Sequence, residues 1–138
     1  MASFMTASRI QPSAAKTTTG TGAQIFLEHH GREVIFFLDL TAAATDVIDT
    51  LDVYVQANVD GTWIDVVHFT QCLGNGGAKQ FVAKTCSGLA DSEFSLATAL
   101  GAAAVRHILS DQYRVRWAIV DADANASFTF SVSAIPRS

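Results

Sequence analysis

The last third of the chain alternates apolar and polar residues with a period of two, which is the spacing of side chains along a β-strand. Every second residue between 127 and 134 is apolar, and the residues between them are serine or threonine. The apolar set is Phe128, Phe130, Val132 and Ala134. Because successive side chains of a strand point to opposite faces, this segment has one buried and one solvated face. Residues 113–119 precede it as another strand.

A tight hairpin is the strongest local prediction in the middle of the chain. Residues 51–59 and 62–69 are two apolar-rich segments separated by Asp60 and Gly61. Both central positions of a type I′ turn need positive φ, which Asp and Gly tolerate. The sequence predicts that five side chains of the first strand face the core, namely Leu51, Val53, Val55, Ala57 and Val59. Trp63, Val67 and Phe69 share a parity on the return strand.

Further strands are predicted on both sides of this hairpin. Residues 23–30 alternate, and residues 34–38 are a continuous apolar run, typical of a strand covered on both faces. Residues 79–85 follow a glycine-rich loop and predict one more strand. Residues 92–109 stay open between an alanine-rich helix and a strand that enters a long loop. The total of about seven or eight strands predicts an all-β fold, a single antiparallel β-sandwich or jelly roll.

The N-terminal segment, residues 1–22, differs from the rest of the chain. It is rich in Ser, Thr, Ala and Gly and has no hydrophobic periodicity. Such a segment buries too little apolar surface to fold alone. Two readings stay open, a disordered tail and an extended arm that orders against a neighbouring subunit through Phe4, Met5 and Ile10. We therefore expect an N-terminal arm followed by a sandwich domain over residues 23–138.

Composition restricts the classes of partner. Hydrophobic residues make up 49% of the chain and charged residues only 16%, against about 25% charged in typical soluble domains. This balance favours permanent association with other subunits. The net charge of −4 argues against nucleic-acid binding, which needs a basic face. No apolar run approaches the ~18 residues that span a bilayer, and the N-terminus does not resemble a secretory signal. We therefore expect no membrane partner and assembly in a reducing cytoplasm.

Cysteine and histidine do not predict a metal or a cofactor. Zinc takes about four ligands, so Cys72 and Cys86 would have to recruit histidines. The adjacent His29 and His30 point to opposite faces of a strand and cannot chelate one ion together. Two free thiols and a disulfide both stay open for the cysteines, although a reducing compartment favours free thiols.

Catalytic motifs are also missing from the sequence. A hydrolase needs a nucleophile held beside a base, and no Gly-x-Ser-x-Gly motif is present. His68 and Cys72 are four residues apart, but Cys72 begins the glycine-rich loop, which is a poor support for a nucleophile. Residues 74–77 lack the Lys-Ser/Thr that completes a phosphate-binding loop. We expect no catalytic residues.

Aromatic and arginine residues are the remaining candidates for binding. Trp63 and Trp117 share the parity of core residues, so we expect both to be buried. Tyr54 faces outward, where aromatic side chains of carbohydrate-binding modules stack against sugars. Arg114 and Arg116 lie on the face opposite Trp117, where they could pair with carboxylates of a neighbouring subunit or stay solvated.

The order of these segments resembles small β-sandwich proteins encoded among the virion genes of tailed bacteriophages. The resemblance covers residues 51–56 and 60–65, Phe69, and then residues 113–117 and 127–132. Proteins of this kind are capsid decoration (cement) proteins and other small head or tail components without catalytic residues. The resemblance thus implies a structural protein of the virion that binds the major capsid protein and copies of itself. Because icosahedral shells offer three-fold positions, a trimer is expected.

Three alternatives remain beside the decoration subunit. A carbohydrate- or receptor-binding module of a tail would need an exposed aromatic cluster near Tyr54. A tail or connector subunit would form rings of six or twelve copies. A small hydrolase would need a cleft that holds His68 with Cys72, or a pair of aspartates.

Overall fold

The computed structural model describes residues 7–27, 32–87, 93–121 and 125–137, and within these ranges the fold is all-β, without an α-helix. The eleven strands are β1 (Ser8–Lys16), β2 (Gly20–Thr21), β3 (Ile25–Phe26), β4 (Glu33–Ala42), β5 (Thr50–Val59), β6 (Thr62–His68), β7 (Cys72–Leu73), β8 (Lys79–Cys86), β9 (Ala104–Val105), β10 (Gln112–Val120) and β11 (Phe128–Arg137). Four of them, β2, β3, β7 and β9, have two residues each. Six of the other seven were predicted from the sequence; the seventh, β1, was not, and of the strand predicted over residues 23–30 the described residues show only β3.

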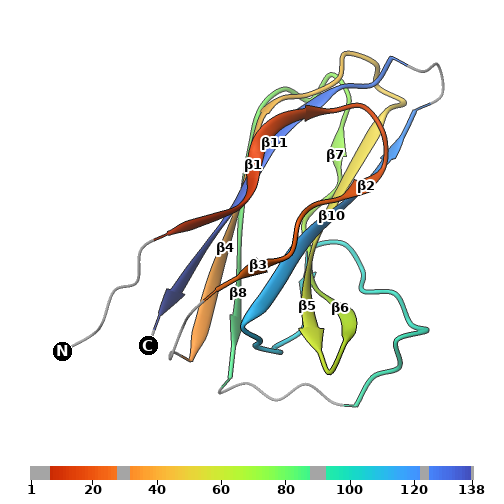
Figure 1. Ribbon diagram of the computed structural model, residues 1–138. Helices are drawn as coiled ribbons and strands as arrows, with labels where there is room; N and C mark the ends of the chain where they lie inside the picture. Colours follow the sequence, from red (N-terminus) through yellow and green to blue (C-terminus); the bar gives the residue numbers. More distant parts are fainter. Residues whose placement is uncertain (1–6, 28–31, 88–92, 122–124, 138) are drawn as a thin grey trace.

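The strands form two sheets that pack face to face (Figure 1). Sheet A has the order β1-β11-β4-β8, and sheet B has the order β2-β10-β5-β6-β9, with β3 on β10 and β7 on β5. All pairs are antiparallel. The predicted antiparallel β-sandwich is therefore confirmed.

The core lies between the sheets and is built by the inward parity of each long strand. The alternation predicted for the last strand is confirmed, because Phe128, Phe130, Val132 and Ala134 are all fully buried. Aromatic rings from the two sheets meet edge to face, with 5.4 Å between the ring centroids of Phe36 and Tyr113. Such contacts add to the burial of apolar area that drives the two layers together.

Strand β4 corrects one prediction. The apolar run was expected to be covered on both faces, but only one parity is fully buried, including Val34, Phe36 and Leu38. Ile35 and Phe37 point away from sheet B and are only partly covered. No second layer lies over the outer face of sheet A among the described residues, so Ile35 and Phe37 stay partly exposed there, beside polar residues such as Ser133 and Lys84.

The central hairpin forms as predicted. Asp60 and Gly61 have φ of 51° and 83°, the positive values that a type I′ turn requires. Leu51, Val53, Val55 and Ala57 are buried, but Val59 is 39% exposed and so is not a core residue. Val59 is the last residue of β5, directly beside the turn.

The N-terminal segment corrects a second prediction. Residues 8–21 are not an arm outside the domain, because β1 pairs with β11 and β2 pairs with β10. Ile10, predicted to anchor a neighbouring subunit, is 1% exposed in the chain's own core. The indole Nε1 of Trp117 donates a hydrogen bond to the carbonyl of Thr18 at 2.9 Å. The segment thus closes one side of the sandwich. Phe4 and Met5 lie outside the described residues.

Residues 93–103 form neither of the two structures considered for that region. They run without regular structure along the side of sheet B and lead into β9. Backbone carbonyls anchor the segment, since Arg106 donates to the carbonyl of Thr98 and His68 contacts the carbonyl of Leu100. The guanidinium of Arg106 also lies 4.2 Å from the ring centroid of Phe94. Polar anchoring of this kind leaves no periodic signal in the sequence.

Candidate functional site

The outer face of sheet B carries a continuous polar network. Arg114 donates to the amide oxygen of Gln56 at 2.7 Å, and the Gln56 amide nitrogen donates to Asp65 at 3.0 Å. Arg116 donates two hydrogen bonds to the same carboxylate, at 2.9 and 2.7 Å. These residues come from β10, β5 and β6, which lie side by side. The network therefore ties the three central strands of the sheet together.

The electrostatics of this network follow from the bidentate pair. Burial raises the pKa of Asp65, but the hydrogen bonds and positive charge of Arg116 outweigh burial, so this pKa lies below its ordinary value. The hydrogen bond to Asp65 raises the pKa of Arg116. Both charges are thus compensated within the chain. The predicted role of Arg114 and Arg116 in binding a neighbour stays a prediction, while the structure shows what they bind within the sheet.

Tyr54 is enclosed by its neighbours. The guanidinium carbon of Arg116, from β10, lies 3.6 Å from the tyrosine ring centroid. His68, from the other neighbouring strand β6, stacks on Tyr54 with 3.9 Å between ring centroids. Trp63 is only partly buried, contrary to prediction, and Arg114 lies 4.3 Å from its ring centroid. These contacts occupy the ring surfaces that a carbohydrate-binding site would need.

His68 is held by contacts that do not include Cys72. Its Nε2 lies 2.8 Å from Asp52 Oδ1, and its Nδ1 lies 2.8 Å from the carbonyl oxygen of Leu100. Carboxylate and carbonyl oxygens only accept, so both contacts are hydrogen bonds when the ring carries two protons. The Cys72 thiol instead donates to the carbonyl of Thr70 at 3.7 Å. Burial and the charge of Asp52 raise the pKa of Cys72 to about 11, which disfavours a thiolate nucleophile.

Metal-ligating side chains do not gather in the part of the chain that the structure describes, where no group of three or more His, Cys, Asp or Glu could hold an ion. His29 and His30 lie outside these residues. Cys72 and Cys86 are both free thiols. Asp121 accepts hydrogen bonds from the backbone nitrogens of Asn125 and Ala126 at 3.3 and 3.0 Å. It stabilises the β10–β11 connection in this way.

Exposed aliphatic side chains gather at one end of the sandwich, the upper end in Figure 1. Thr50 pairs with Leu73 of β7 on one side and with Val120 of β10 on the other, so these side chains share the outer face. Leu73 is 48% and Val120 is 60% exposed. Val47 and Ile48, in the connection that leads to Thr50, are 57% and 54% exposed. We call Val47, Ile48, Leu73 and Val120 the aliphatic end.

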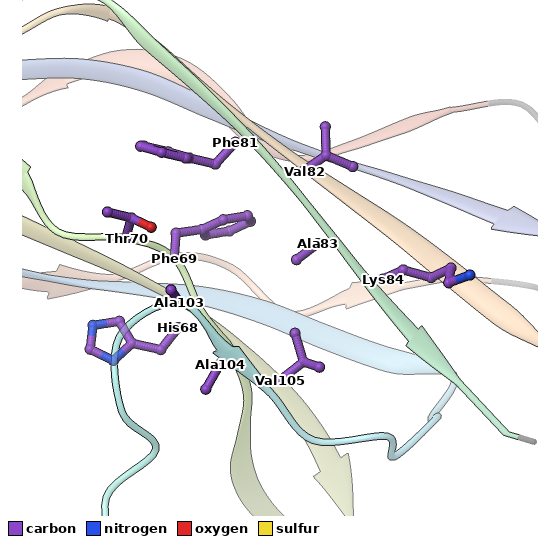
Figure 2. Close-up of a pocket in the computed structure, with 10 residues that line it drawn as sticks. All are labelled: His68, Phe69, Thr70, Phe81, Val82, Ala83, Lys84, Ala103, Ala104 and Val105. Carbon is purple, nitrogen blue, oxygen red and sulfur yellow. The ribbon is translucent and has the colours of Figure 1, made fainter. Parts of the chain in front are cut away.

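A second candidate site lies where the two sheets separate at β8. A cavity of about 240 Å³ is lined by residues of β8, of β9 and of the end of β6. Figure 2 shows Phe69 and Ala83 pointing toward each other across this space, with Val105 below them and Val82 directed away. Val82 is 68% exposed. The strand was predicted from its sequence, but its position at an edge was not, because the neighbours of a strand are set by the topology.

Comparison with profiles of known protein families and with curated proteins found no match to this chain. A search of the described residues for a helix long and apolar enough to cross a bilayer found none. Inference about function therefore rests on the aliphatic end and on the edge strand β8, where exposed apolar side chains lie.

Proposed function

We propose that this protein is a structural subunit of a tailed-phage particle, and more narrowly a capsid decoration subunit that binds the assembled shell. The observation that carries the proposal is the aliphatic end. Four large aliphatic side chains, each roughly half exposed or more, occupy one end of the fold, whereas polar groups on the outer face of sheet B bond to one another. Several exposed apolar side chains at one end of a domain are typical of a surface that a partner covers.

The mechanism needs no chemistry at the site. A subunit that binds only the assembled shell stabilises that shell by mass action. Many copies on one particle add their contributions, so weak contacts at each position are sufficient. The major capsid protein is the proposed partner, and the aliphatic end is the proposed contact surface.

The test is sedimentation of the protein with expanded shells assembled from the major capsid protein of the same genome. We expect saturable binding and shells that resist heat better. Leu73→Ser and Val120→Ser remove part of the apolar contact and should each weaken binding about 5–30-fold. Phe26→Ser is the matched control, because Phe26 is 66% exposed but pairs with Gln112, at the opposite end of β10.

Other outcomes would redirect the proposal. Rings of six or twelve copies that ignore shells would favour a tail or connector subunit. Binding to glycans on an array, with no affinity for shells, would favour a receptor-binding module. Equal shell binding by the Leu73→Ser and Phe26→Ser variants would contradict the role of the aliphatic end.

A further inference from the structure

Strand β8 differs from every other edge of the sandwich. It runs for eight residues without proline or glycine, and its pairing with β4 has no register shift. The opposite edge of sheet A, β1, contains Pro12 and two register shifts. The edges of sheet B end in the two-residue strands β2, β3 and β9. Proline, bulges, short strands and lysines are devices that protect edges from pairing. Among the described residues, β8 is the longest edge strand without proline or a register shift, and its protection is limited to Lys79 and Lys84.

Hydrogen bonds at the end of β8 identify which backbone groups are open. The nitrogen of Ser87 donates to the carbonyl of Arg32, toward β4, whereas the nitrogen of Cys86 donates away from β4, to His107 Nδ1. Backbone groups of successive residues point to opposite sides of a strand. The even-numbered residues of β8 therefore direct their N–H and C=O groups away from β4. On the stretch before Cys86 these residues are Gln80, Val82 and Lys84.

We propose that two copies of this protein associate through β8, antiparallel, across a two-fold axis that passes between their Val82 residues. In a hydrogen-bonded antiparallel pair, the two residues direct their N–H and C=O groups at each other. Because only the even-numbered residues of β8 point these groups outward, an even-numbered residue of one copy must lie opposite an even-numbered residue of the other. Centring on Val82 meets this condition. It places Gln80 opposite Lys84 of the second copy, and each such pair exchanges two hydrogen bonds.

The side chains complement one another in this register. On the inner face, Phe81 of the second copy lies opposite Ala83, whose small side chain borders the cavity of about 240 Å³. An apolar cavity of about 150 Å³ already accepts a benzene ring, so a phenyl group fits there. On the outer face Val82 meets its own copy, and no lysine opposes a lysine. Lys84 is 3.6 Å from Glu33, which offsets part of its charge.

The free edges favour this dimer over the trimer expected from shell symmetry. A closed ring requires two different surfaces on each copy. In the described part of the chain the other edge of sheet A is β1, where Pro12 and the register shifts interrupt the ladder. A two-fold pairing uses β8 alone. The proposal goes beyond the decoration function and does not depend on it, since it concerns contacts between copies and not contacts with a shell.

Sedimentation velocity over a range of concentrations tests the association. One edge pair buries less than the ~1,600 Å² of a standard interface, so we expect a dissociation constant of about 1–100 µM. Val82→Lys brings two cations together at the axis, and Val82→Pro removes an N–H that does not bond to β4. Both should give monomers with an unchanged circular dichroism spectrum. Val59→Lys is the control, because Val59 is an exposed valine on another strand, β5, and it should remain dimeric.

Crosslinking tests the register. In a background with Cys72→Ser and Cys86→Ser, Val82→Cys should form a disulfide dimer under mild oxidation, because residues in a hydrogen-bonded pair lie about 5.5 Å apart. Gln80→Cys alone should not, since four residues of strand, about 13 Å, separate the two thiols. A mixture of Gln80→Cys and Lys84→Cys should crosslink.

Three results would overturn the proposal. The first is a wild-type protein that stays monomeric at every concentration, which would show that the lysines of β8 protect the edge. The second is an oligomer that Val82→Lys and Val82→Pro leave intact. The third is efficient crosslinking of Gln80→Cys alone, which would reject the register centred on Val82.

Discussion

At the scale of single residues, Asp65 holds the polar face of sheet B together. Its carboxylate accepts from Gln56 and from two nitrogens of Arg116. Such a constellation is stabilising only while the carboxylate is ionised, because a protonated carboxyl loses the ion pair and competes as a donor. The network should therefore respond to acid.

The sign of this response follows from the lowered pKa of Asp65. In the unfolded chain an aspartate titrates near about 3.9. The carboxylate thus contributes stability above that value, and the contribution is lost as the pH falls through the lower folded pKa. We expect Asp65→Asn to reduce the free energy of unfolding by about 1–2 kcal/mol at pH 7. The difference from wild type should shrink below about pH 4.

Urea unfolding at pH 7 and at pH 3 measures this difference. Asp60→Asn is the control, because Asp60 is an exposed turn residue and asparagine also tolerates positive φ. The same difference in unfolding free energy between wild type and Asp65→Asn at pH 7 and at pH 3 would count against an ionised Asp65 in the folded protein.

At the scale of elements, β1 is an integral strand of sheet A. Ile10 packs in the core while Arg9 beside it is exposed. Removal of a buried isoleucine side chain to alanine costs about 2–5 kcal/mol. We expect Ile10→Ala to lower the free energy of unfolding by that amount, and Arg9→Ala to change it by less than about 0.5 kcal/mol. Chemical denaturation of both variants gives the comparison, and equal stabilities would mean that β1 is detachable.

The elements also show which features of the fold could be predicted from the sequence. Alternation over eight or nine residues, as in residues 127–134 and 51–59, predicts both the strand and its buried face. The segment of β1 carries no such pattern, since most of its residues are small and exposed. It is ordered by backbone pairing with β11, which is a tertiary contact. The exposed Val82 likewise depends on which strand lies beside β8.

The candidate sites were predictable only in part, for the same reason. Tyr54, Arg114 and Arg116 were placed on the outer face from their parity, and the structure agrees. That Asp65 joins the two arginines depends on the neighbouring positions of β10, β5 and β6. The aliphatic end depends likewise on pairs between Thr50 and residues far along the chain. The order of the strands in the sheet determines which of these side chains meet, and a local sequence pattern does not contain that order.

At the scale of the whole molecule, the sandwich does not depend on a disulfide. Both cysteines are free, and a domain of 138 residues has a large enough core without covalent staples. We expect the same melting temperature with and without a reducing agent. Native alkylation at pH 8 should modify Cys86 first, since Cys72 is 3% exposed and has a pKa of about 11. Both should react in urea. A mass two daltons lower before reduction would reveal a disulfide and contradict this expectation.

The pairing of β1 with β11 and of β2 and β3 with β10 has a consequence for biosynthesis. The first strands to leave the ribosome can find their partners only after residues 112–137 have been translated. Until then β4 also lacks one neighbour, β11, and its apolar faces stay exposed. Folding of this sandwich must therefore follow translation of its last two strands, and nascent chains that stop short of β10 should depend on chaperones or be degraded.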